Sequence, residues 1–290
     1  MKLRLAIEGF QTPNHLPLIA GIEQGEFAEA GLDIEIVPPD PGHDELARVA
    51  TGEIELACAT PLHMLDAPRP QLRALGCFLE TEGGILILHS AMEALAAGGR
   101  IRLAVPARGL AARVAIEMLR RWFDAHHPSI GLDQIDVRTA GPNHIENLYA
   151  GFDAAWPCFA NVEGVEAVQR QVDGRFLSTH EVGLANAAGL ELFTSAEFLT
   201  RHPEIVDRVR DVISRSAQMC SEHPVMAREL WYRHVGAAPD AVTDAILDDT
   251  GSRFVTPLVR ERSRWYGLWK QLDDLGRGEL TEQEFEELYA

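Results

Sequence analysis

The order of apolar and polar positions predicts alternating strands and helices along the first part of the chain. Residues 2–7 and 32–37 alternate as half-buried strands do, and residues 13–29 between them have the pattern of a helix. The next elements, in the order helix, strand, helix and strand, are expected at residues 44–50, 54–58, 61–65 and 72–78. Because the links are short, this alternation predicts a mostly parallel sheet with helices on both faces.

A second block of the same kind follows residues 85–88, which are continuously apolar, as a strand buried on both faces would be. Its strands and helices are expected in turn at residues 101–105, 110–123, 135–137, 145–150, 152–156, 162–172 and 175–178. Another apolar run occupies residues 190–193, and only helices are predicted from residue 195 onward.

Two α/β blocks joined at residues 85–88 and 190–193 predict an α/β protein of two lobes. Lobe 1 is expected to be discontinuous, with residues 1–86 and 191–290, and to include the C-terminal helices. Lobe 2 is expected at residues 87–190. Two connecting strands would form a hinge, and such a pair of lobes closes on a ligand between them.

Charge narrows the choice of partners. The 290 residues include 44 Asp and Glu against 26 Lys and Arg, a formal charge of −18. A surface this negative repels phosphate backbones, so no nucleic acid is expected as a partner.

No stretch approaches the ~20 apolar residues that cross a bilayer, so no membrane insertion is expected. The N-terminus has no signal-peptide pattern, which predicts a cytoplasmic location as the sequence stands, or a periplasmic one if Met1 replaces a removed signal peptide.

Cysteine and lysine usage argues against several chemistries. The four cysteines have no close metal-type or redox-type spacing, so no metal site is expected. Lys2 and Lys270 are the only lysines, and Schiff-base chemistry requires a lysine amine. We therefore expect no cofactor. Neither a Gly-x-Ser-x-Gly elbow nor a His-Glu-x-x-His motif occurs, so no motif requires an enzyme.

Polar residues that follow the predicted strands are the candidate ligand contacts, because ligands of open parallel sheets bind beyond the carboxyl ends of strands. In the first block these residues are Gln11, Thr12, Asn14, His15, Thr60, His63 and Glu82. Helix capping is an alternative interpretation for Thr12, Asn14 and Thr60. A hydrogen-bonded surface or core histidine is the alternative for His63.

The second block adds four candidates. Arg108 lies between a strand and a helix, where an Arg and backbone N–H groups can hold an anion. Trp156, at the end of a strand, is either a stacking plate for a flat ring or a core residue. Asn161 and Glu163 follow that strand. Cys158 would form a thiol–imidazole pair with a histidine if the fold brought them together.

Several runs of residues resemble one superfamily. FQTPNHLPL at residues 10–18 and GEFAEAGLDI at residues 25–34 resemble the fungal-type thiamine pyrimidine synthases and the bacterial binding proteins for pyrimidine precursors, alkanesulfonates and nitrate. The likeness continues at residues 51–56 and 197–204. It implies a type II periplasmic-binding-protein-like fold whose cleft takes a small planar or anionic molecule.

The same resemblance also indicates which functional groups of those enzymes this chain lacks. His15 and His63 align with histidines of the pyrimidine synthases, but Ala59 stands where those enzymes have the lysine that carries pyridoxal phosphate. Their cysteine-rich loop aligns with residues 184–188, which contain no cysteine. An alanine cannot supply an amine, so the resemblance does not carry over the synthase reaction. A related sulfinate desulfinase has a catalytic cysteine after the first strand, where this chain has Thr12 or Asn14.

The first hypothesis is a substrate-binding protein of the ABC transporter class. Its ligand would be a flat heteroaromatic molecule like the thiamine pyrimidine precursor, or a small anion such as a sulfonate, and an ABC permease is a further candidate partner. The alternative is a cytoplasmic enzyme on the same scaffold, related to thiamine pyrimidine biosynthesis, with His15 or His63 as general base. A cytoplasmic ligand sensor is a third possibility. All require residues 11–15, 60–63 and 156–163 to converge on one pocket.

Overall fold

The computed structural model describes residues 1–38, 44–65, 69–106, 109–274, 276 and 280–290. The chain divides into two compact units. Unit 1 consists of Met1–Glu80, Gly189–Trp269 and Glu279–Ala290, and unit 2 consists of Thr81–Ala188 and Lys270–Gly278. The predicted lobe boundaries at 86/87 and 190/191 remain a prediction.

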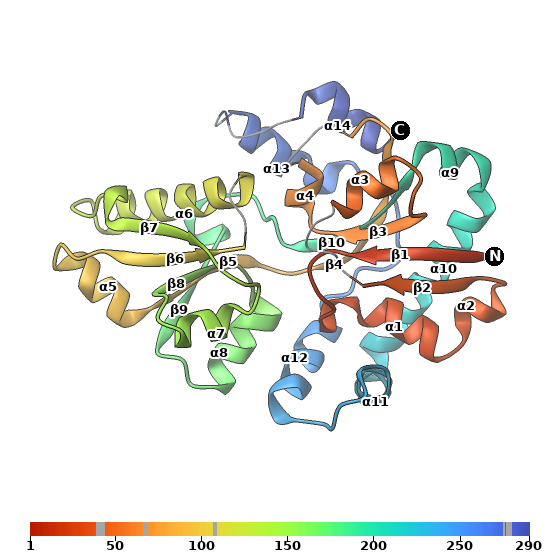
Figure 1. Cartoon of the computed structure of the whole chain (residues 1–290), viewed down its shortest axis with the longest axis horizontal. Helices are drawn as coiled ribbons and strands as arrows, with labels where there is room; N and C mark the ends of the chain where they lie inside the picture. The colour runs from red at the N-terminus through yellow and green to blue at the C-terminus, as the bar shows by residue number, and fades with distance from the viewer. Residues whose placement is uncertain (39–43, 66–68, 107–108, 275, 277–279) are drawn as a thin grey trace. The chain divides into compact units, whose positions relative to one another are not determined.

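Unit 1 is built on a five-stranded sheet in the order β2-β1-β3-β10-β4 (Figure 1). Its strands are β1 (Lys2–Ile7), β2 (Asp33–Val37), β3 (Leu56–Ala59), β4 (Leu72–Glu80) and β10 (Gly189–Ser195). The first three are parallel, and β10 runs antiparallel to both β3 and β4. Because β10 lies between them, Cys58 pairs with Leu192 and Cys77 with Glu191. Both cysteines are buried free thiols.

Helices cover both faces of this sheet. Figure 1 shows α1 (Leu16–Glu23) and α2 (Glu26–Glu29) on one side of β1, and α3 (Glu45–Ala50) and α4 (Pro61–Leu65) on the other. The remaining helices that lie wholly or partly in unit 1 are α9 (Ala196–Arg201), α10 (Pro203–Glu222), α11 (Pro224–Val235), α12 (Ala241–Gly251), α13 (Ser263–Asp274) and α14 (Glu282–Leu288).

The helix predicted at residues 13–29 is interrupted. A 3-10 turn occupies Pro13–His15 before α1, and α1 and α2 are separated at Gly25. Gly25 has a φ of +77°, in the left-handed region that glycine adopts without a Cβ clash. The break explains why one predicted helix is two short ones.

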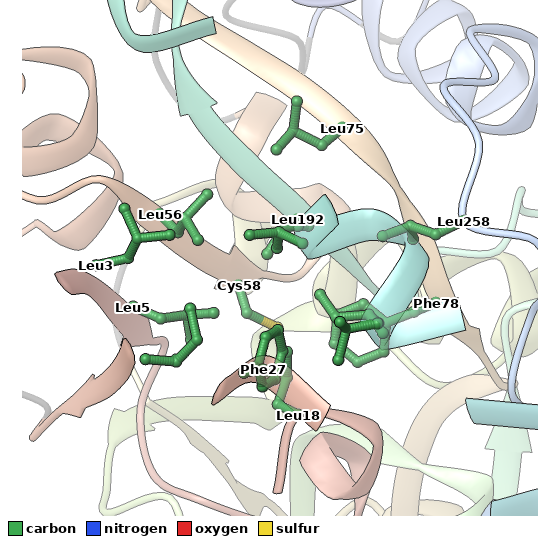
Figure 2. Packing of buried hydrophobic residues seen from close by; sticks show 14 of the residues in the cluster. Leu3, Leu5, Leu18, Phe27, Leu56, Cys58, Leu75, Phe78, Leu192 and Leu258 are labelled. Atoms are coloured by element: carbon green, nitrogen blue, oxygen red, sulfur yellow. The ribbon is translucent and has the colours of Figure 1, made fainter. Parts of the chain in front are cut away.

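The core of unit 1 forms where α1, α2 and α10 pack on the sheet. Figure 2 shows Leu5 of β1, Phe27 of α2, Phe78 of β4 and Leu192 of β10 among the side chains of this cluster. Phe78 and Leu192 have no exposed surface. On β1, the residues of this cluster (Leu3, Leu5 and Ile7) occupy alternate positions, as the period-two pattern of the sequence predicts.

One glycine of this sheet is required by its surroundings. Gly76 lies where β4 shifts register against β10; its φ is +139°, and a Cβ there would lie 2.6 Å from the carbonyl oxygen of Val259. We expect Gly76→Ala to lower the free energy of unfolding by about 2 kcal/mol or more, measured by urea unfolding. Gly267→Ala is the control, because a Cβ at Gly267 would meet nothing within 4 Å. Equal stability of the Gly76→Ala and wild-type proteins would contradict this conformation.

Unit 2 has its own five-stranded sheet in the order β7-β6-β8-β5-β9. Its strands are β5 (Gly83–Leu88), β6 (Ile101–Val105), β7 (Ile135–Thr139), β8 (Ala154–Phe159) and β9 (Gly174–Ser178). β5 runs antiparallel to β8 and β9, and β6 runs parallel to β7 and β8. In Figure 1, α6 (Leu110–His126) lies on one face of this sheet, and α7 (His144–Tyr149) and α8 (Val165–Gln169) lie on the other.

The segment predicted as a connection between blocks, residues 85–88, is thus part of an inner strand of unit 2. It leads into α5 (His89–Ala96), a helix that the sequence pattern did not predict. Among the helices of the described residues, none combines the length and the apolar character that crossing a membrane requires.

Candidate functional site

In unit 1, the carboxyl ends of β1 and β3 are neighbours, since Ile7 pairs with Cys58. Glu8 follows β1 directly and organises this edge. Its Oε2 accepts a hydrogen bond from the backbone N–H of Thr60 (2.9 Å), and its Oε1 lies 2.6 Å from Nε2 of His63. Thr60 and His63 were predicted from the sequence but Glu8 was not, although an acidic residue directly after a strand was the available signal.

The Glu8–His63 pair leaves His63 accessible. The His63 side chain is 51% exposed, so the pair contributes little stability, roughly 0–1 kcal/mol. His63 therefore remains able to contact a ligand. A thiol–imidazole pair with Cys158 has no support, because burial among apolar groups and the nearby Glu163 raise the pKa of the Cys158 thiol well above its usual range. A thiol that stays protonated is a poor nucleophile.

His15 is the most constrained histidine of this edge. The backbone N–H of Thr12 donates to His15 Nδ1 at 3.1 Å, so the turn that caps the next helix also fixes the ring. The side chain is buried, and burial lowers the pKa of His15 to about 4, against smaller opposing effects of Thr12 and Glu8. Nε2 of this ring is buried without a hydrogen-bond partner among the described residues. A neutral ring whose Nδ1 is occupied does not suit a general base.

Asn14 and Gln11 belong to the same segment, but their side chains have different surroundings. Asn14 is buried at 3% exposure beside His15. Gln11 lines a separate cavity of about 440 Å³ within unit 1. The other residues that line this cavity are apolar except for one histidine: Ile7, Ile22, Ile34, Ile36, Pro38 and His234. The remaining unit 1 candidates do not line it.

In unit 2, one sheet edge brings together three segments that are distant in sequence. The start of β5 lies between the ends of β8 and β9, since Gly83 pairs with Phe159 and Gly84 with Ser178. The backbone N–H of Ala160 donates to the carbonyl of Glu82 (2.8 Å). Likewise, the N–H of Thr179 donates to the carbonyl of Gly83 (2.9 Å).

Asn161 and Glu163 lie on a π-helical turn, Ala160–Gly164, where the sequence predicted the start of an ordinary helix. Such turns occur frequently at functional sites. Both side chains are buried. The Glu163 carboxylate accepts the backbone N–H of Phe159 at 2.7 Å, yet burial outweighs that bond and raises the pKa of Glu163 to about 7.

Trp156 is 1% exposed, and its indole N–H is buried without a partner among the described residues. Two hydroxyl groups near this edge, those of Thr81 and Thr179, are likewise buried and unpartnered in the described part of the chain. Neither threonine was among the ligand contacts predicted from the sequence. Arg108, which it did name, lies outside the described residues.

Similar solved structures share this architecture. The alkanesulfonate-binding protein SsuA from Xanthomonas axonopodis pv. citri bound to MOPS has a TM-score of 0.66 and 16% identity, over 95% of this chain and 92% of that one. A Candida albicans protein with the generic periplasmic binding protein fold has a TM-score of 0.67 and 15% identity, over 99% and 94%. The periplasmic nitrate-binding protein NrtA from Synechocystis PCC 6803 has a TM-score of 0.58 and 15% identity, over 80% and 65%.

The two sheets thus form a periplasmic-binding-protein fold, and the prediction of an α/β protein with two lobes is confirmed. The family described as NMT1/THI5 like matches residues 12–75 and 122–227, more than half of the chain. The chain therefore belongs to the NMT1/THI5-like family, which confirms the resemblance of the sequence motifs. No match was found among curated proteins.

Proposed function

We propose that this protein binds a small molecule and belongs to the ABC-type substrate-binding class. The observation that carries the proposal is the buried ring nitrogen Nε2 of His15 near the carboxyl edge of β1, which has no hydrogen-bond partner among the described residues. A buried polar group without a partner costs about 1–3 kcal/mol, so such groups usually have a ligand, a water or a function. Its position at the carboxyl edge of a parallel sheet favours a ligand.

Unit 2 supports the same proposal independently. The N–H of Trp156 and the hydroxyl of Thr179 are further buried groups that can donate a hydrogen bond and lack a partner in the described part of the chain. Two carboxylates of these edges already accept backbone hydrogen bonds, Glu8 from Thr60 and Glu163 from Phe159. Among the buried groups without a partner in the described residues, the indole N–H of Trp156 can only donate, and the hydroxyls of Thr81 and Thr179 can donate or accept.

Donors of this kind suit a ligand that is rich in acceptors. The SsuA structure is described as alkanesulfonate-binding and NrtA as nitrate-binding, and both ligands carry acceptor oxygens. Sulfonates, nitrate and flat pyrimidines are thus the ligand classes to test. The proposal extends to an ABC permease as partner and to a periplasmic location, as in the nitrate-binding protein. It includes the candidate residues of both edges as ligand contacts.

The test is a thermal-shift screen of sulfonates, nitrate and pyrimidines, followed by calorimetric titration of the compounds that raise the melting temperature. Trp156→Phe, which keeps an aromatic ring but removes the N–H, is expected to weaken binding about tenfold. Trp231→Phe is the matched control, since Trp231 is a buried tryptophan of α11. If no compound binds, the proposed function is wrong; if Trp156→Phe binds like the wild type, Trp156 is not part of the site.

A further inference from the structure

His15 has two ring nitrogens in very different surroundings. Nδ1 lies 3.1 Å from the backbone nitrogen of Thr12, 3.3 Å from the Thr12 hydroxyl and 3.2 Å from the Thr12 carbonyl oxygen. Nε2 has no partner among the described residues and is buried. Which nitrogen carries the proton decides what His15 can offer a ligand.

The surroundings of Nδ1 settle its protonation. The backbone N–H of Thr12 always carries its hydrogen and points at Nδ1, so a proton on Nδ1 would place two hydrogens against each other. The Thr12 carbonyl already accepts the backbone N–H of His15 at 2.9 Å, so it does not depend on a ring proton. Nδ1 is therefore the acceptor, and in a neutral ring the proton resides on Nε2.

The ring is also neutral. It is 4% exposed, and its burial holds the pKa well below neutrality even though the Glu8 carboxylate acts in the opposite direction. A neutral imidazole with Nδ1 occupied presents one free function, the Nε2–H donor.

We infer that Thr12 locks His15 in the Nε2–H form, so that His15 selects ligands that place a hydrogen-bond acceptor against it. This inference rests on the proposed binding function and adds a specificity-determining residue with a defined role. In this form, His15 does not act as a cation that pairs with an anionic group, and it does not act as a base. A ligand with a donor at this position would meet a second donor, and would be rejected because two buried N–H groups would remain unpaired.

The first experiment needs no ligand. Two-bond ¹H–¹⁵N spectra of the histidine rings at pH 7, with His15 assigned by its absence in His15→Phe, report which ring nitrogen carries a proton. A protonated Nε2 and a bare Nδ1 are the expected result. A proton on Nδ1, or on both nitrogens, would overturn the inference whether or not any compound binds.

The second experiment uses the sulfonate, nitrate or pyrimidine that binds most tightly to the wild-type protein. His15→Phe, which keeps the ring and loses the N–H, is expected to weaken binding about tenfold or more. His15→Gln, whose side-chain amide can donate near the same point, is expected to stay within about threefold of the wild type. Unchanged binding by His15→Phe, or equal losses in both variants, would contradict the donor role. Binding by the wild type in either case would leave the proposed function standing.

Discussion

Phe285→Ala is expected to lower the free energy of unfolding by about 4 kcal/mol, the usual loss for a fully buried phenylalanine. Phe285 has no exposed surface and lies at the centre of an aromatic cluster that holds α14. Its ring stacks on Trp269, with centroids 5.4 Å apart and an interplanar angle of 25°. Tyr266 and Tyr289 lie at 5.9 and 5.5 Å. Aromatic pairs of this kind add about 0.5–1.5 kcal/mol to the burial of their surface.

Urea unfolding followed by tryptophan fluorescence measures this loss. Phe285→Leu should cost less than Phe285→Ala, since it leaves a smaller cavity and removes only the ring contacts. Val225→Ala is the control for an apolar truncation in the same unit, because Val225 is 60% exposed. A loss below about 1 kcal/mol for Phe285→Ala would mean that α14 is only loosely attached to unit 1.

The sequence pattern predicted most strands but neither α5 nor α14. In the sequences of β1, β2 and β6, apolar and polar residues alternate or the residues are apolar over the full length. Such patterns are typical of strands and fit few other structures. In α14, the apolar residues are few: Phe285 and Leu288 are interspersed among acidic residues, a composition typical of a solvated chain. Its stability comes from contacts with α13, such as the stacking of Phe285 on Trp269 (16 residues earlier in the chain), which periodicity alone does not reveal.

Local sequence pattern also predicted the candidate site only in part. The rule that ligands gather beyond the ends of strands named Thr60, His63 and Glu163 correctly as residues of the two sheet edges. It missed Glu8, whose partner His63 is far along the chain, and Thr179, which joins its edge only because β9 pairs with β5. Strand order decides such neighbours, and local pattern does not encode it.

Nor could the sequence give the protonation of the site. Glu163 and His15 are ordinary residue types, and their pKa values depart from the usual range mainly because the fold buries them. The position of a residue after a strand predicts that it lies at an edge. Its burial depends on the structure of neighbouring segments. One of these is the π-helical turn Ala160–Gly164, where the pattern predicted the start of an ordinary helix.

We expect the effect of Glu163→Gln on the free energy of unfolding to depend on pH. The change that the substitution causes should be about 3 kcal/mol more stabilising above pH 7 than below pH 4.5. Burial raises the pKa of Glu163 from 4.5 to about 7, so between these values the folded protein keeps a proton that the unfolded chain releases. The stability contributed by this group is complete below pH 4.5 and is lost as the pH rises through 7. Glutamine can still accept the Phe159 N–H but does not ionise.

The wild-type profile alone would hide this effect. Burial lowers the pKa values of His15 and His144 to about 4, so in the folded state both release protons that the unfolded chain binds up to about pH 6.5, and stability rises with pH over that window. The two trends oppose each other, and only the difference between Glu163→Gln and wild type isolates the carboxyl. Urea unfolding at pH 4.5, 5.5, 7 and 8 measures it, with Glu93→Gln on the exposed side of α5 as the control. A difference that stays constant across this range would show that Glu163 is ionised throughout, and that its carboxylate has a compensating partner.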